Sequence, residues 1–295
     1  MRIVVFGAGS LGSLLGGLLA REHRVTLVGR DPHVSTIRED GLRISGAIEA
    51  HVFPDATTDA DLAADLVLVT VKSYDTARAA RTLSTGEFGA VLSLQNGIGN
   101  EDRLARDLDS PVLAGTASYG AALERPGEVA CTGVGRVVLG SSEGGESALA
   151  ARVGEAFADA GIEATVAADM PRRLWEKCAV NAGINPVTAL AGIENGAILA
   201  DPAWPIAREA ARETARVARE NGVELAEETA VGALRRVASA TRENTSSMAQ
   251  DLEKGRRTEI DAINGAVVEH ARSEVPTNAL LAGLVKTWET SKGLR

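Results

Sequence analysis

The chain of 295 residues is poor in aromatic residues, cysteine and histidine. Aromatic residues make up only 3% of it, so the cores expected from its 45% hydrophobic content must consist mainly of aliphatic side chains. The two cysteines, Cys131 and Cys178, lie outside any metal-binding or redox spacing. We therefore expect a reduced, cytoplasmic protein without a disulfide framework. The four histidines are scattered, and they indicate neither a catalytic triad nor a metal site.

Positive charge and long apolar runs are also scarce. The net charge of −9 and the lack of basic runs argue against nucleic-acid binding. No apolar run reaches the ~20 residues that a membrane span needs, and no signal segment precedes the first predicted strand. The expected partner is therefore a small-molecule substrate, with no nucleic acid and no membrane. The oligomeric state stays open, with a homodimer as one option.

The most informative motif lies at the N-terminus, where the apolar run Ile3–Phe6 meets a G-x-G-x-x-G turn. A helical stretch and a second β-prone run, Val25–Val28, complete the setting that this motif requires. Gly7 permits the tight turn, Gly9 lets the backbone approach a pyrophosphate, and Gly12 allows close helix packing. The predicted dinucleotide-binding residues of this turn are Gly7, Ala8, Gly9, Ser10, Leu11 and Gly12.

The end of the second strand bears on the choice of cofactor. Sites for NAD usually place an acidic residue there for the ribose 2′-hydroxyl. Here Arg30 could clamp a 2′-phosphate with its planar guanidinium, which favours NADPH over NADH. Asp31 leaves a ribose contact open, and Arg30 also fits a solvated loop.

Two further runs, Asp65–Val71 and Ala90–Leu94, suit parallel strands that are buried on both faces. Ligands of open α/β sheets bind beyond the carboxyl ends of the strands. We therefore expect Lys72 near the adenosine phosphate and Asn96 near the nicotinamide ribose or the substrate, although Asn96 equally suits an Asn-Gly turn. The small-residue segment around Gly120 would let a cofactor lie close to the backbone.

The character of the sequence changes near residue 169. Before it lie β-prone runs, among which Glu128–Cys131 and Arg136–Leu139 are expected to form an antiparallel pair. After it, helical signals dominate. We predict an α/β Rossmann domain with a mostly parallel, doubly wound sheet over residues 1–168, followed by an all-α domain over residues 169–295.

The stretch 175–186 is predicted to form a helix that ends at Pro186, because proline disfavours the helical conformation of the residue before it. Lys177, Asn181 and Asn185 recur every four residues and so share one face. A desolvated lysine with a lowered pKa could give a proton to a nascent alkoxide while the amides hold a polar substrate. The same residues also fit a solvated lysine followed by asparagines that end a helix.

A second polar cluster spans residues 244–248 and precedes another predicted helix. Ser246 or Ser247 could be only an N-cap there. Glu259 could likewise be only a carboxylate in the first turn of a helix, where the helix dipole favours it.

Taken together, these motifs resemble the ketopantoate reductase family. The resemblance rests on the glycine turn, Val71-Lys72, Leu94-Gln95-Asn96-Gly97, the lysine–asparagine helix, Asn195-Gly196 and the stretch 244–261. It implies a Rossmann domain, a helical domain and a site in the cleft between them. It also implies NADPH-dependent reduction of ketopantoate to (R)-pantoate on the route to pantothenate and coenzyme A. At Gly120 the family more often has alanine.

The resemblance also implies roles for individual residues. Lys177 would be the general acid, Arg30 and Lys72 would hold the 2′-phosphate, and Glu259 would organise the cofactor end of the cleft. The residues implied in substrate binding are Asn96, Lys177, Asn181, Asn185, Asn195, Asn244 and Ser247. Two alternatives stay open: a related reductase of another branched 2-oxo acid, and a dinucleotide sensor without turnover.

Overall fold

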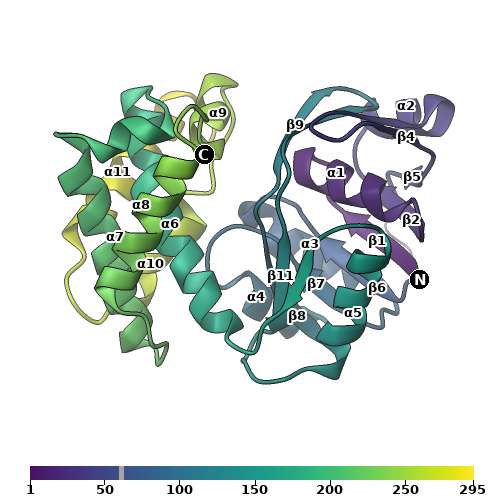
Figure 1. Cartoon of the computed structure of the whole chain (residues 1–295), viewed down its shortest axis with the longest axis horizontal. Helices are drawn as coiled ribbons and strands as arrows, with labels where there is room; N and C mark the ends of the chain where they lie inside the picture. The colour runs from purple at the N-terminus through teal and green to yellow at the C-terminus, as the bar shows by residue number, and fades with distance from the viewer. Residues whose placement is uncertain (60–62) are drawn as a thin grey trace. The chain divides into compact units, whose positions relative to one another are not determined.

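The computed structural model describes residues 1–59 and 63–295, and the chain divides into two compact units. Unit 1 comprises Met1–Gln95 and Asn100–Met170, and unit 2 comprises Asn96–Gly99 and Pro171–Arg295. Unit 1 is α/β and unit 2 is helical (Figure 1), which confirms the predicted fold class. The four residues Asn96–Gly99, called the 96–99 loop below, lie in unit 2 although their neighbours in sequence lie in unit 1.

Unit 1 is organised around an eight-stranded sheet of order β12-β11-β8-β7-β6-β1-β2-β5, parallel except between β8 and β11. The order outward from β1 is doubly wound, and it reverses between β1 and β6. In such a sheet, ligands bind at the carboxyl ends of the strands beside this reversal. The strands are β1 (Arg2–Phe6), β2 (Arg24–Val28), β5 (Asp55–Thr57), β6 (Leu66–Val69), β7 (Val91–Ser93), β8 (Val112–Ala117), β11 (Val137–Ser141) and β12 (Ala164–Val166).

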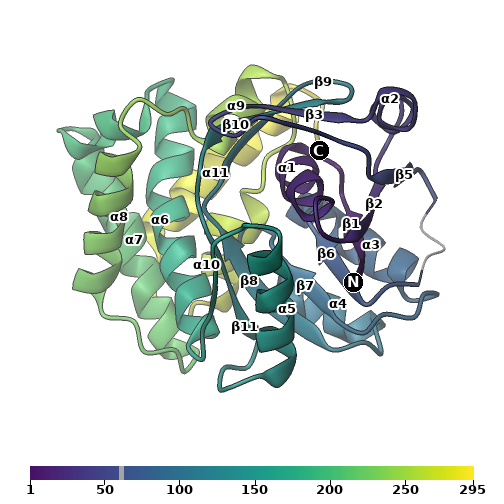
Figure 2. The ribbon, with the colours of Figure 1, turned by 45° about the vertical axis from the view of Figure 1, so that its right-hand side comes forward.

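A smaller sheet of order β4-β3-β10-β9 lies over helix α1, which packs between the two sheets (Figure 2). Its strands are β3 (Leu42–Gly46), β4 (Ala50–Val52), β9 (Gly120–Arg125) and β10 (Glu128–Gly133). The helices of unit 1 are α1 (Ser10–Leu19), α2 (His33–Asp40), the 3₁₀ turn η1 (Ser73–Asp75), α3 (Thr76–Leu83), α4 (Asn100–Asp107) and α5 (Ala148–Asp159).

Both faces of the large sheet are buried, because alternate side chains of a strand point to opposite faces. In β1, Ile3 and Val5 join the core that contains α1 and α5, whereas Val4 joins the core that contains α3 and α4. This arrangement explains why the central strands are continuous apolar runs.

The predicted antiparallel pairing of Glu128–Cys131 with Arg136–Leu139 is wrong. Strand β10 pairs with β9 and β3 in the small sheet, whereas β11 pairs with β8 and β12 in the large one. The turn between β9 and β10 contains Gly127 with φ +76°, a conformation that glycine adopts readily. This tight turn gives β10 a partner on its N-terminal side.

Unit 2 is helical and alanine-rich. Its elements are α6 (Met170–Ala191), the 3₁₀ helix η2 (Asn195–Leu199), α7 (Ala203–Glu220), α8 (Glu227–Ala240), α9 (Ser247–Glu253), the π-turn η3 (Asp261–Gly265), α10 (Ala266–His270) and α11 (Pro276–Ser291). Ile98 of the 96–99 loop is buried in the core of this unit. None of the helices within residues 1–59 and 63–295 is both long and apolar enough to cross a membrane.

The helix predicted to end at Pro186 instead continues to Ala191. Proline has no N–H, so the carbonyl of Ala182, four residues earlier, loses its usual helical partner. The side chain of Asn264 supplies a substitute, because its Nδ2 donates a hydrogen bond of 3.2 Å to the Ala182 carbonyl. The prediction was therefore wrong because a contact from 82 residues further along the chain offsets the local cost of proline.

Candidate active-site residues

The glycine turn joins β1 to α1 at the carboxyl end of the sheet. The main-chain N–H groups of Gly7 and Ala8 both donate to the Val28 carbonyl, at 3.0 and 2.9 Å, and so tie the turn to β2. The Ser10 hydroxyl accepts a hydrogen bond of 3.0 Å from the Leu123 N–H of β9. The turn is thus held by both sheets.

The three glycines of the turn differ in how much space surrounds them. A Cβ at Gly7, whose φ is +118°, would lie 2.7 Å from the Val71 nitrogen. One at Gly12 would collide with the Gly7 carbonyl oxygen. A Cβ at Gly9 would meet no atom nearer than 4.0 Å. Leu11 packs its side chain against the core. The backbone at Gly9 therefore leaves room for a ligand to approach it closely.

The surroundings of this turn fit an anionic group. The first N–H groups of a helix have no partner within it, and α1 carries no acidic residue in its first turn. Arg30 is exposed just after β2, and Lys72 is half-buried just after β6. Asp31 accepts a hydrogen bond of 3.2 Å from the Ser35 N–H, so one of its oxygens already contacts α2.

Gly120 is the first residue of β9, in the small sheet. A Cβ there would lie 2.5 Å from Thr132 Oγ1 and 2.9 Å from the Gly133 nitrogen. Alanine would fit at this position only if β10 shifted. The glycine in this chain therefore accompanies a close approach of the two strands.

Lys177, Asn181 and Asn185 all lie on α6, as the spacing predicts. Lys177 and Asn181 are half-buried and Asn185 is buried. The neighbouring thiol of Cys178 is buried as well, and this burial raises its pKa to about 12. Cys178 therefore stays protonated at neutral pH, whereas Glu176, on the other side of Lys177, forms ion pairs with Arg172 and Arg236.

Asn96 and Glu259 are in direct contact although 163 residues separate them. Asn96 Nδ2 donates a hydrogen bond of 3.0 Å to Glu259 Oε2, and the Glu259 side chain is buried. Both residues belong to unit 2. Glu259 precedes the π-turn η3, whose N-cap is Ile260, and its side chain contacts Asn96.

The π-turn η3 begins two residues after Glu259, and successive residues of it contact the other site elements. The Ala262 carbonyl accepts a hydrogen bond of 3.0 Å from the Ile98 N–H of the 96–99 loop. The Ile263 carbonyl lies 3.9 Å from the Cys178 thiol of α6, and Asn264 donates to α6 as described above. The π-turn therefore joins the 96–99 loop to α6.

Glu289 of α11 holds the segment that carries Glu259. Its Oε1 accepts two hydrogen bonds of 2.7 Å from Thr258, one from the main-chain N–H and one from the hydroxyl. Its Oε2 accepts a bond of 2.5 Å from Arg295. Sequence reasoning missed the roles of Thr258, Glu289 and Asn264, since no local pattern marks contacts between such distant positions.

Asn195 and Asn244 are brought together by main-chain contact, because the Asn195 N–H donates to the Asn244 carbonyl at 3.0 Å. The Asn195 Nδ2 donates to Thr241 Oγ1, also at 3.0 Å. The Asn195 Oδ1 is buried without a hydrogen-bond partner among the described residues. Asn244 itself is exposed.

The structure separates the two serines at the start of α9. Ser246 is the N-cap, because its Oγ accepts a hydrogen bond of 3.2 Å from the Ala249 N–H. The same Oγ lies 2.7 Å from the Thr188 hydroxyl of α6. Ser247 is exposed. The capping role therefore belongs to Ser246, and Ser247 stays a candidate for binding substrate.

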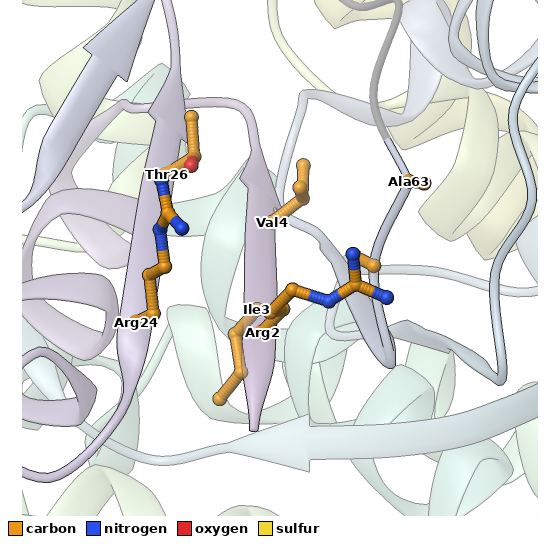
Figure 3. A pocket seen from close by; sticks show the side chains of 7 residues that line it. Arg2, Ile3, Val4, Arg24, Thr26 and Ala63 are labelled. Carbon is orange, nitrogen blue, oxygen red and sulfur yellow. The ribbon is translucent and has the colours of Figure 1, made fainter.

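A pocket lies at the opposite, amino end of β1 and β2 (Figure 3). Arg2 and Arg24 line it from these two strands. Arg2 forms an ion pair of 3.7 Å with Asp65, and Arg24 one of 3.5 Å with Asp55. Because these charges are paired and lie away from the carboxyl ends of the strands, this pocket is not the candidate active site.

Comparisons with known proteins agree over both units. Residues 3–144 match the family model "Ketopantoate reductase PanE/ApbA", and residues 169–289 match "Ketopantoate reductase PanE/ApbA C terminal". A 2-dehydropantoate 2-reductase of Halobacterium salinarum is 46% identical over 97% of this chain and 98% of its own.

Two solved structures resemble the whole chain. One is a PanE/ApbA family ketopantoate reductase from Ralstonia eutropha, with a TM-score of 0.90 and 33% identity, covering 99% of this chain and 100% of that one. The other is a D-mandelate dehydrogenase with NADH and anilino(oxo)acetate, with a TM-score of 0.93 and 25% identity, covering 100% of both chains.

Proposed function

The chain belongs to the ketopantoate reductase family of oxidoreductases, which act on CH–OH groups, and we propose that it reduces 2-dehydropantoate (ketopantoate) to (R)-pantoate with NADPH. The observation that carries the proposal is the lysine–asparagine face of α6, in the same compact unit as the contact between Asn96 and Glu259. Pantoate would then enter the route to pantothenate and coenzyme A.

The glycine turn would hold the pyrophosphate of the dinucleotide. Its support is the open space over Gly9, the helix N-terminus and the absence of an acidic residue in the first turn of α1. Arg30 and Lys72 would hold the 2′-phosphate, and the backbone at Gly120 would lie close to the cofactor. Bound NADPH supplies the hydride that reduces the 2-oxo carbon.

Unit 2 would hold the 2-oxo acid and supply the proton. Lys177 would donate a proton from its ammonium group to the carbonyl oxygen as the hydride arrives, and solvent would then reprotonate the amine. The side-chain amides and the hydroxyl would bind the polar groups of the substrate; they are those of Asn96, Asn181, Asn185, Asn195, Asn244 and Ser247. Glu259 would orient Asn96 through their hydrogen bond.

The test is an absorbance assay of NADPH oxidation with ketopantoate, run beside NADH and a panel of other 2-oxo acids. We expect fast turnover with ketopantoate and NADPH and much slower turnover with the other substrates. Tight NADPH binding without turnover of any 2-oxo acid would contradict the proposal and would favour a dinucleotide sensor.

A second candidate function is reduction of a different 2-oxo acid with NADH. It is favoured by the likeness to D-mandelate dehydrogenase, whose complex contains NADH and anilino(oxo)acetate, a 2-oxo acid derivative. The same panel separates the candidates, because this function requires activity on another 2-oxo acid and a preference for NADH.

A further inference from the structure

The helix that carries Lys177, Asn181 and Asn185 contains a proline in its interior. Pro186 cannot donate to the Ala182 carbonyl, and its ring also crowds that carbonyl. Ala182 lies one residue after Asn181, and Pro186 directly follows Asn185. The direction of the two amide side chains therefore depends on how the backbone settles around this unpaired carbonyl.

A chain of buried polar side chains fixes the direction of Asn264. Asn264, Asn278 and Glu213 are all at most 1% exposed. Glu213 Oε2 accepts hydrogen bonds from the Asn278 N–H at 2.9 Å and from Asn278 Nδ2 at 2.8 Å. Asn278 Oδ1 in turn accepts from Asn264 Nδ2 at 2.9 Å. A carboxylate can only accept, so it sets the orientation of both amides, and Nδ2 of Asn264 must face α6.

The position of Asn264 in sequence adds a second link. It lies two residues after Ala262, whose carbonyl binds the 96–99 loop through the Ile98 N–H, and five residues after Glu259, which contacts Asn96. The Gly265 N–H donates a hydrogen bond of 2.9 Å to the Ile260 carbonyl, five residues earlier, which is the spacing of a π-helix. One short turn thus fixes both the Asn96 side of the site and the backbone of α6.

We infer that Asn264 is a positioning residue, which holds the Asn181–Asn185 turn of α6 in register with Asn96 and Glu259 through the carbonyl that Pro186 leaves unpaired. The inference rests on the proposed function, because it assigns a purpose to side chains that bind the 2-oxo acid there. Asn264 would itself touch neither substrate nor cofactor.

Removing the donor tests the inference. In Asn264→Ala we expect kcat/KM for ketopantoate to fall by between about tenfold and a hundredfold, the effect of a small misplacement of binding groups. The KM for ketopantoate should rise, whereas the KM for NADPH should stay within about twofold, since the glycine turn belongs to unit 1.

A matched control is Asn221→Ala. The Asn221 Nδ2 also donates to helix carbonyls of unit 2, those of Val217 and His270, at 2.8 and 3.0 Å. Within the part of the chain that the structure describes, these side-chain hydrogen bonds do not reach α6. We expect this variant to keep kcat/KM within about twofold of the unmodified protein. An equal loss in both variants would overturn the inference.

The decisive measurement is a double-mutant cycle with Pro186→Ala. Alanine restores the N–H that the Ala182 carbonyl lacks, so Asn264→Ala should cost no more than about threefold in kcat/KM in that background. The same cost in both backgrounds would show that Asn264 does not act through the Ala182 carbonyl, and would overturn the inference.

Two additions keep the test decisive. Should Asn264→Ala not fold, Asn264→Ser, which keeps a shorter donor, takes its place in the cycle, with the same expected rescue and the same contrary outcome. The midpoint of thermal unfolding is measured in the unmodified protein, the two single variants and the double variant. It should show the same dependence of one substitution on the other, independently of turnover. If the two substitutions have non-additive effects on the unfolding midpoint but the protein turns over no 2-oxo acid, the proposed function is rejected and the contact is kept. Additive effects on the midpoint would reject the contact.

Discussion

The glycine turn of unit 1 and the α6–π-turn region of unit 2 are two candidate binding regions built in opposite ways. The first uses six adjacent residues, Gly7 to Gly12, and acts mainly through its backbone. The second joins side chains that are up to 163 residues apart, through contacts such as that between Asn96 and Glu259. The groups of the glycine turn are contiguous in sequence and are anchored by hydrogen bonds to Val28 and Leu123, whereas the side chains of unit 2 come from several elements that must pack in register. Changes in the two regions should therefore have different consequences.

The largest expected effect separates chemistry from cofactor binding. In Lys177→Ala, kcat should fall by about 10²–10⁴ because the general acid is lost, whereas the affinity for NADPH should be kept. Lys177→Arg is the matched control, since arginine keeps the charge but does not release its proton. Rates and NADPH affinities of both variants are measured side by side. An arginine variant with near-normal kcat would show that charge, not proton transfer, is what the site needs.

The next effect distinguishes two glycines of the turn, Gly9 and Gly12, by whether substitution changes cofactor affinity or stability. Gly9→Ala has open space for its methyl group, so its unfolding midpoint should hold while NADPH affinity falls at least about tenfold. Gly12→Ala would press against the Gly7 carbonyl and should lose about 1–3 kcal/mol of unfolding free energy. Urea unfolding and NADPH titration measure the two quantities. Unchanged NADPH affinity in Gly9→Ala would argue that no pyrophosphate lies there.

A smaller effect concerns the choice between the two dinucleotides. Arg30→Ala should weaken NADPH binding by about tenfold or more, because hydrogen bonds to charged groups are worth ~1.5–3 kcal/mol, and should leave NADH binding nearly unchanged. Titration of the variant with each dinucleotide gives both affinities. Arg21→Ala, which changes an exposed arginine of the same unit, is the control. Equal losses for NADPH and NADH would count against a 2′-phosphate contact.

The smallest effect compares how the two units respond to pH. His33 is buried in unit 1, where its Nδ1 accepts a hydrogen bond of 3.0 Å from the Gly127 N–H, and burial lowers its pKa below 6.5. The unfolded chain therefore takes up the proton first, and unit 1 should lose stability as the pH falls below about 6.5. For Asp261 in unit 2, burial raises the pKa. The hydrogen bonds from Lys286 and Arg295 lower it by more than burial raises it, so the net pKa lies below 3.8. The stability it contributes is present above pH 3.8 and is lost only as the pH falls through its folded pKa.

The three tryptophans provide the measurement, because Trp175, Trp204 and Trp288 all lie in unit 2. As the pH is lowered from 7.5 to about 5.5, the urea midpoint of unfolding followed by circular dichroism should fall. The midpoint followed by tryptophan fluorescence should not change. The shift should vanish in His33→Asn, which keeps an acceptor for Gly127 but does not titrate. A tryptophan transition that moves as far as the dichroism signal would contradict a response confined to unit 1.

The same contrast explains what the sequence could predict. The βαβ arrangement around Gly7 to Gly12, the buried central strands and the change to helices near residue 169 all follow from local composition and spacing. The pairing of β10 was predicted wrongly, because strand pairing depends on partners elsewhere in the chain and not only on the spacing of two neighbouring runs. The partners of β10 are β9, which the turn at Gly127 joins to it, and β3, and both lie outside the pattern that suggested the pair.

The candidate site shows the same division. The common helix of Lys177, Asn181 and Asn185 followed from their spacing, whereas the end of that helix did not, since Asn264 offsets the effect of Pro186. The contact of Glu259 with Asn96 was likewise beyond local reasoning, and so was the division of work between Ser246 and Ser247. In each case the observed contact depends on a partner that is distant in sequence or on the direction of one hydroxyl group.

The assignment of the 96–99 loop to unit 2 has a consequence for recombination between relatives. A chimera made with a single crossover near residue 170 would join the helices of one parent to the loop of the other. Ile98 would then enter a foreign core, and Asn96 would face a foreign Glu259. Successful exchange of the helical unit therefore requires a two-part graft, in which Asn96–Gly99 and Pro171–Arg295 are both taken from the same parent.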